Sequence, residues 1–197
     1  MRTSRLEAFS DGVLAIIITI MVLELRVPEG PTLHDLGASA TGLLTYLLSF
    51  VYVGIYWNNH HHMFQLVERV TGGILWSNLG LLFCLSLLPF TTAWMDEQHF
   101  AATPVITYGV NLLVCALAYW VLQSAIERDQ GRGGALATAL GRDLKARSSP
   151  PLYLAGVLGT LLAPWLGVAL YTVVALMWLV PDRRVERYLA AHPAPGQ

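Results

Sequence analysis

Charged side chains are scarce in this sequence. Only 13% of its 197 residues are Asp, Glu, Lys or Arg, whereas soluble domains carry about 25%. Hydrophobic residues make up 55% of the chain, and its mean hydropathy is +0.53. This composition favours a protein that is solvated by lipid over a soluble globular domain. The net charge of −1 also argues against a nucleic-acid partner, which would require a clustered basic face.

Cysteine is scarce as well, and the motifs of several enzyme classes are missing. The two cysteines, Cys84 and Cys115, lie inside apolar runs and cannot form a disulfide framework or a CxxC metal site. The chain contains no serine nucleophile elbow, no HExxH and no phosphate-binding loop. We therefore expect neither an enzyme nor a bound cofactor.

Long uncharged runs predict several membrane spans. Residues 36–65, 70–95 and 100–126 contain no Asp, Glu, Lys or Arg, and each run is long enough to cross a bilayer once. The first helix is less obvious because Glu7 and Asp11 interrupt it, and no small-residue cleavage site follows it. We interpret it as a retained helix from Arg5 to Arg26, about 33 Å long at 1.5 Å per residue.

The last apolar run, from Ser148 to Pro181, fits either one long span or two short spans broken at Pro164. Basic residues concentrate in cytoplasmic loops, and this bias separates the two alternatives. With six spans and a cytoplasmic N-terminus, 11 of the 12 Lys and Arg residues lie inside, and only Arg26 lies outside. With five spans the three C-terminal arginines move outside and the division is 8 to 4. Six spans are therefore expected.

The fold class predicted from these patterns is an all-α integral membrane protein, with one domain over residues 1–190. A cytosolic loop is expected at 127–149, and a disordered tail at 191–197. Both termini are expected in the cytoplasm, and the location is the cell membrane. The six expected spans are approximately residues 5–26, 37–64, 72–95, 102–126, 150–163 and 165–181.

An ionisable residue inside a membrane is a functional candidate, which draws attention to Asp11 in the first helix. On a helical wheel at 100° per residue, Asp11 lies on a different face from the stripe of Ile16, Thr19, Ile20 and Leu23. If that stripe lines a pore, the carboxylate must be paired with a neighbouring helix, so a structural role for Asp11 is favoured over ion binding. Without further information, the stripe itself would be packing or lipid contact.

The consecutive histidines His60, His61 and His62 resemble a metal site only superficially. Neighbouring residues of a helix diverge by 100°, so three in a row cannot converge on one ion. We therefore expect no structural metal. Glu24 is a candidate for attracting cations at the outer end of the first helix, or it pairs with Arg26.

Three motifs resemble the family of transmembrane protein 175, the endolysosomal potassium channel, and its prokaryotic relatives. Residues 5–11, RLEAFSD, match the family signature RxxxFSD, and Trp57, His60 and Phe64 match its WxxHxxxF pattern. Asn78 and the segment 88–91, LPFT, resemble its third-helix pattern. Beyond residue 95 the resemblance depends on helix number and topology alone.

The resemblance implies a homotetramer of six-helix subunits in which the first helix of each subunit lines a central pore. Such a pore has no carbonyl filter, and no TVGYG-like segment occurs here. Rings of apolar side chains would constrict it at Ile16, Ile20 and Leu23. The Thr19 hydroxyl would add an oxygen layer, with permeant potassium passing near Thr19 and Ile16. The function implied is passive, potassium-preferring cation conduction.

The resemblance also implies a polar network that holds the first helix in place. It would be formed by Arg5, Phe9, Ser10, Asp11, Trp57, His60 and Asn78. The alternative hypothesis is a proton-coupled cation transporter with Asp11 and His60 as a relay, although inverted repeats are not apparent. A coupled flux would separate this alternative from a passive channel.

Overall fold

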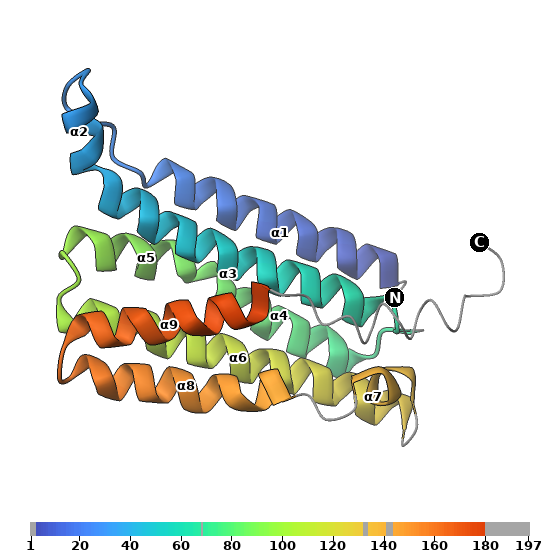
Figure 1. The fold of residues 1–197 in the computed structure, drawn as a ribbon. Coiled ribbons are helices and arrows are strands. Elements are labelled where there is room, and N and C mark those ends of the chain that lie inside the picture. The colour runs from blue at the N-terminus through green and yellow to red at the C-terminus, as the bar shows by residue number, and fades with distance from the viewer. Residues whose placement is uncertain (1–2, 68, 132–133, 141–143, 180–197) are drawn as a thin grey trace.

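The computed structural model describes residues 3–67, 69–131, 134–140 and 144–179, and every regular element in these ranges is a helix. The longer helices run side by side along one axis and form an elongated bundle, with the short helices α2 and α7 at its two ends (Figure 1). The helices are α1 Thr3–Leu23, α2 Leu33–Ala38, α3 Ala40–Phe64, α4 Gly72–Ser86, α5 Leu88–Glu97, α6 Ala102–Gln130, α7 Ala135–Leu140, α8 Leu144–Thr160 and α9 Pro164–Leu179.

Four segments are long and apolar enough to cross a membrane: α1, α3, the pair α4–α5, and α6. The helix α9, Pro164–Leu179, is apolar but shorter. A helix satisfies all its backbone hydrogen bonds internally, which is why apolar runs of this length fold as helices in lipid. The chain is therefore an all-helical membrane protein.

The third apolar run is divided at Leu87 into α4 and α5, although the two helices together form one candidate span. Pro89 lies in the first turn of α5. Proline has no backbone N–H and cannot continue the hydrogen-bond ladder of the preceding helix. The sequence predicted one span over residues 72–95, and the break at Leu87 within it follows from this missing donor.

At one end of the bundle, which we call the α2 end, a short helix joins α1 to α3 (Figure 1). It begins with a capping box in which the Thr32 hydroxyl accepts from the Asp35 backbone N–H and the Asp35 carboxylate accepts from the Thr32 backbone. The Thr32 hydroxyl also donates to the Asp35 carboxylate, and this bond, followed by the one from the Thr32 backbone N–H, lowers the pKa of the Asp35 carboxyl. The opposite end carries α7 and is called the α7 end.

The segment 127–149, expected to be a loop, is largely helical where the structure describes it. It contains the last turn of α6, the whole of α7 and the first residues of α8. α8 also includes Pro150 and Pro151 in its interior, where the prediction placed the start of a span. Propensity alone suggests a boundary at these prolines, but the packing of α8 against α6 and α9 keeps the helix continuous. The expected tail, 191–197, lies outside the described residues.

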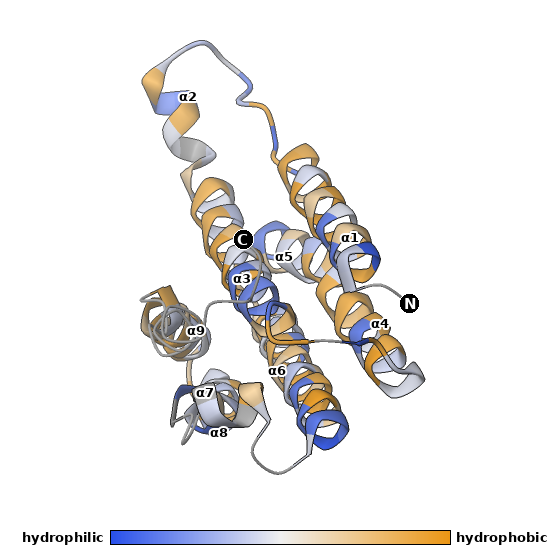
Figure 2. Ribbon diagram, turned by 90° about the vertical axis from the view of Figure 1, so that its right-hand side faces the viewer, coloured by the Kyte–Doolittle hydropathy of each residue, from blue (hydrophilic) through white to orange (hydrophobic). Residues whose placement is uncertain are grey.

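α1 lies along one edge of the bundle, where it packs against α3, α4 and α5. α8 and α9 form a hairpin that packs on α6 and α3. Figure 2 shows that the ribbon of α1 is mainly hydrophobic, with hydrophilic residues towards its N-terminal end. Because α1 is peripheral in the bundle, one of its faces packs on no other helix among the described residues.

Candidate functional site

The first helix has one face that packs on the rest of the chain. Its buried residues recur every three or four positions, as expected for one stripe of a helix. Ser10, the polar residue of this stripe, is completely buried, and the apolar residues of the stripe are at most 3% exposed. The stripe consists of Leu6, Ser10, Leu14, Ile17 and Met21.

The opposite face of α1 carries the residues that were expected to line a pore. Ile16 is 59% exposed, Ile20 is 42% exposed and Leu23 is 82% exposed. Thr19 is also exposed, and its hydroxyl donates a hydrogen bond to the carbonyl oxygen of Ile16 at 2.8 Å. The four residues therefore form an apolar stripe with one hydroxyl, and no other helix of the described part of the chain covers this stripe.

Asp11 lies between these two faces and contacts a different helix. The indole Nε1 of Trp57 in α3 donates a hydrogen bond to Oδ1 of Asp11 at 3.0 Å. A hydrogen bond to an ionised acceptor is stronger than one between neutral groups. Trp57 also stacks on His61, one turn further along α3, which fixes the orientation of the indole ring. This contact is the pairing that the wheel argument required of the carboxylate.

A second set of polar contacts joins α1, α3 and α4 in the interior. The amide Nδ2 of Asn78 donates to Oγ of Ser10 at 3.0 Å, and Nε2 of His60 lies 2.8 Å from Oδ1 of Asn78. Ser10 in turn donates to the carbonyl oxygen of Leu6 at 2.9 Å. Asn78 is completely buried, and His60 is 2% exposed. Three buried side chains thus satisfy one another, as buried polar groups must.

Two members of the expected network lie apart from it. Phe9 is 52% exposed, and Arg5 is also exposed. Neither has a side-chain hydrogen bond or ion pair to another residue in the part of the chain that the structure describes. The motif therefore divides into Ser10 and Asp11, which face neighbouring helices, and Arg5 and Phe9, which point outward.

Sequence reasoning missed a further polar cluster that joins α3, α5 and α6. Oγ of Ser49 lies 2.7 Å from Oγ1 of Thr92 and 3.0 Å from the hydroxyl of Tyr108. Close by, Asn111 donates to Oγ1 of Thr91 at 3.4 Å. The available signal was the presence of polar side chains within otherwise apolar runs, because such groups need partners in a membrane.

The described residues contain no group of three or more His, Cys, Asp or Glu side chains that could hold a metal ion. The histidine triplet diverges as expected. His60 bonds to Asn78, whereas the ring of His61 bonds to Gln65 on the next turn of α3.

The region that contains α1 and its partners is similar to known proteins. A family model described as "Endosomal/lysosomal potassium channel TMEM175" matches residues 5–89, which include most of α1 and all of α3 and α4. A potassium channel of a Chryseobacterium species is 50% identical over 189 residues, which cover 96% of this chain and 98% of that protein. The chain belongs to this family.

A solved structure agrees with the family assignment. The crystal structure of a lysosomal potassium-selective channel TMEM175 homolog from Chamaesiphon minutus has 30% sequence identity and a TM-score of 0.74. The alignment covers 89% of this chain and 95% of that one. The chain is thus a bacterial-type member of a channel family and not of an enzyme family, in agreement with the sequence analysis.

The animal relatives are longer and have a different name. The human relative, named endosomal/lysosomal proton channel TMEM175, is 29% identical over 130 residues. This match covers 63% of the present chain but only 25% of the human protein. The human relative is therefore named for protons, whereas the bacterial relatives are named for potassium.

Proposed function

We propose that this protein is a potassium-preferring cation channel of the cell membrane, built as a homotetramer in which α1 of each subunit lines a central pore. The observation that carries the proposal is the uncovered stripe of α1. Exposed fractions of 59% at Ile16 and 82% at Leu23 contrast with 2% at the neighbouring Leu14 and Ile17. The relative with 50% identity, named a potassium channel, supports the choice of ion.

Rings of apolar side chains would form the constriction of this pore. Four copies of Ile16, followed by rings of Ile20 and Leu23, would narrow it to near the size of a bare ion. A narrow apolar ring gates by excluding water from the pore. Selectivity would then follow from how easily each ion loses its water, and potassium is less tightly hydrated than sodium. This argument predicts a modest potassium preference.

Thr19 would supply oxygen ligands between these rings. Its hydroxyl proton is already donated to the carbonyl of Ile16. Because the proton points towards that carbonyl, the lone pairs of the Thr19 oxygen remain available as acceptors. A cation binds to such lone pairs and requires this orientation of the hydroxyl. Permeant potassium would therefore be stabilised close to Thr19 and Ile16.

Six spans per subunit are the topology that we propose, with both termini in the cytoplasm. α8 has 17 residues and α9 has 16, so each is about 25 Å long at 1.5 Å per residue. That length is slightly below the hydrocarbon thickness of about 30 Å, which a short helix accommodates by local thinning of the bilayer. In this topology the α7 end is cytoplasmic and the α2 end is external.

Protons are the second candidate ion, because the animal relatives are named proton channels. A relay through Asp11 and His60 would require these side chains to exchange protons with water. In the structure Asp11 is bonded to Trp57 and His60 to Asn78. These contacts support a structural role for both residues and a passive channel over a coupled transporter.

A liposome flux assay tests the proposal. The purified protein is reconstituted with potassium inside, and efflux is measured against sodium, N-methylglucamine and a proton gradient. We expect potassium flux that follows its own gradient, with a reversal potential independent of pH. Flux that stops when the proton gradient is removed would instead establish a coupled transporter.

A further inference from the structure

The two ends of α1 are held to the rest of the chain in different ways. Towards the α7 end, Thr3 donates a hydrogen bond to the carbonyl oxygen of Val67 at 3.2 Å, and Ser10 and Asp11 bond to α4 and α3. Over residues 12–23, no side chain of α1 forms a hydrogen bond or ion pair with another helix among the described residues. The part of α1 that carries the proposed constriction therefore has fewer polar contacts than the part before it.

One ion pair connects the α2 end of α1 to another helix. Nη2 of Arg26, just beyond the last turn of α1, lies 3.1 Å from Oε1 of Glu97, the last residue of α5. The two residues are 71 positions apart in the sequence, and α5 ends at the α2 end of the bundle (Figure 1). Within the described ranges, no second ion pair or side-chain hydrogen bond joins residues 12–31 to a helix other than α1.

Open space adjoins this ion pair. A hollow of about 480 Å³ is lined by Ile20, Glu24 and Glu97, together with aromatic residues of α5. A second hollow, of about 200 Å³, is lined by Arg26 and Glu97, together with the start of α3. Met21 is the last residue in the buried stripe of α1. Packing therefore restrains α1 less strongly beyond this residue, and the ion pair supplies a larger share of what holds its end.

We propose that Arg26 and Glu97 are positioning residues for conduction, which hold the end of the pore helix against α5 and thereby set the width of the rings formed by Ile20 and Leu23. Because Ile20 lines the hollow beside α5, this end of α1 has room to move towards its own subunit and away from the pore axis. Such a movement would widen the rings and admit a hydrated ion more easily. The inference rests on the proposed channel function, because it gives the ion pair a role at the constriction.

The ion pair biases this movement and does not prevent it. Its side chains are 69% and 52% exposed, and an exposed ion pair changes an equilibrium by about twofold. Loss of the pair should therefore about double the population in which the end of α1 is displaced. Since a wider ring removes less water from an ion, the displaced population should discriminate less against sodium.

Hydrogen–deuterium exchange tests the contact without any ion flux. The full-length protein is reconstituted in nanodiscs, and mass spectrometry follows the backbone amides of residues 20–26. Arg26→Gln and Glu97→Gln should each increase their exchange rate about twofold, and the charge swap, Arg26→Glu with Glu97→Arg, should restore the wild-type rate. Asp96→Asn is the matched control. It removes a carboxylate of α5 that forms no ion pair among the described residues, and it should leave the rate unchanged.

The sodium-to-potassium permeability ratio tests the consequence for the pore. It is measured from the reversal potential of the reconstituted protein between potassium and sodium solutions. Both neutralising variants should raise this ratio about twofold, the charge swap should restore it, and Asp96→Asn should leave it as in the wild type. The swap keeps the net charge at this end of the bundle, so its rescue separates the ion pair from a general electrostatic effect.

Three results would overturn the proposal. In the first, residues 20–26 exchange at the wild-type rate in both neutralising variants. In the second, Asp96→Asn has the same effects as Glu97→Gln, or the charge swap fails to rescue. In the third, the exchange rate changes and the permeability ratio does not, so that the pair holds α1 without positioning the constriction. A wild type that conducts no potassium would refute the proposed channel function instead, and the exchange rates would still decide whether the pair holds α1 against α5.

Discussion

The indole of Trp57 donates a hydrogen bond to the carboxylate of Asp11 at 3.0 Å and thereby ties α1 to α3. The two residues are 46 positions apart in the sequence, and both belong to motifs of the family. Their contact gives a structural reason for an acidic residue beside the apolar stripe of α1.

Removing either partner of this hydrogen bond should weaken the position of α1. We expect Asp11→Ala and Trp57→Phe each to lower the thermal stability of the purified protein, with a coupling of about 1 kcal/mol between them. A double-mutant cycle based on melting temperatures in detergent measures this coupling. Asp11→Ala should also reduce the tetramer fraction in cross-linking. Intact tetramers with a lost potassium preference would instead assign Asp11 to the pore.

The apolar stripe should control conduction. Ile16→Asn places an amide in the proposed constriction, which should wet it and raise the potassium flux into liposomes. Val22→Asn introduces the same polarity on another exposed part of α1 and serves as the control, with flux near that of the wild type. Unchanged flux in Ile16→Asn would refute the gate. Equal increases in both variants would show a general loosening of the helix.

Asn78 connects two buried polar groups, and its removal should be costly. Asn78→Ala leaves Ser10 without its donor and His60 without its acceptor. Each unsatisfied buried group costs about 1–3 kcal/mol, so a loss of about 2–4 kcal/mol in unfolding free energy is expected. Asn58→Ala is a suitable control because no side-chain hydrogen bond ties Asn58 to the described residues. Similar melting temperatures for the two variants would contradict the role of the network.

Gly156 allows the hairpin α8–α9 to pack closely. A Cβ at this position would overlap the ring of Tyr171, which is completely buried. Gly156→Ala should therefore separate the two helices and lower stability by about 1–3 kcal/mol, as overpacking does elsewhere. Gly159→Ala on the same helix meets only Leu166, at an ordinary 3.5 Å, and should be tolerated. Circular dichroism melts in detergent compare the two, and equal stability would refute the close packing.

Glu24 should attract cations at the α2 end of α1. Arg26 pairs with Glu97 at 3.1 Å, so the alternative pairing of Glu24 with Arg26 is not the one that the structure shows. Glu24→Gln should reduce potassium flux at low ionic strength and have little effect at high salt, because screening weakens exposed charges. Glu29→Gln, in the loop before α2, is the control. An effect of Glu24→Gln that does not depend on salt would contradict an electrostatic role.

Local physical chemistry made the helices predictable. In lipid, backbone N–H and C=O groups can form hydrogen bonds only with other groups of the protein. Uncharged runs such as 36–65 and 100–126 therefore had to form helices. The two faces of α1 followed from the helical period alone, and residue motifs were sufficient to recognise the family. Helix breaks were less predictable, because Pro89 ends a helix whereas Pro150 and Pro151 lie inside one.

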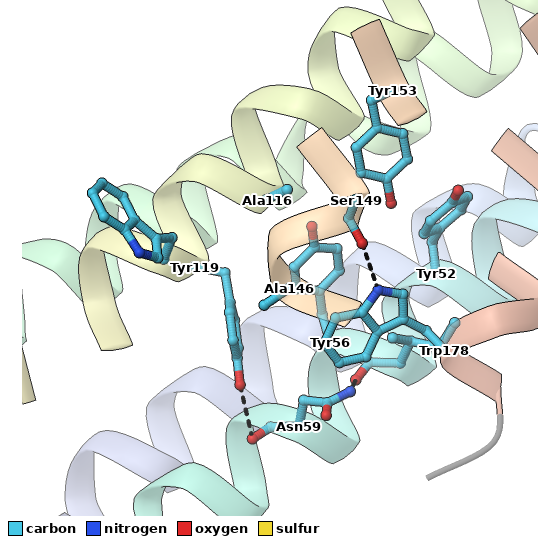
Figure 3. A pocket seen from close by; sticks show the side chains of 11 residues that line it. Tyr52, Tyr56, Asn59, Ala116, Tyr119, Ala146, Ser149, Tyr153 and Trp178 are labelled. Carbon is cyan, nitrogen blue, oxygen red and sulfur yellow. Dashed lines mark hydrogen bonds between the residues drawn. The ribbon is translucent and has the colours of Figure 1, made fainter. Parts of the chain in front are cut away.

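Only the tertiary structure decided which side chains meet. Whether Glu24 or Glu97 pairs with Arg26 depends on how helices far apart in sequence are rotated against one another. The same rotation brings Asn78 between Ser10 and His60 and leaves Arg5 and Phe9 outside. A small pocket lined by aromatic side chains is formed by α3, α6, α8 and α9 together (Figure 3), so no local pattern could reveal it. In this protein the sequence by itself determined the helices and their faces, because both depend on neighbours along the chain. The contacts that hold α1 in place depend on neighbours in space, so only the tertiary structure determined them.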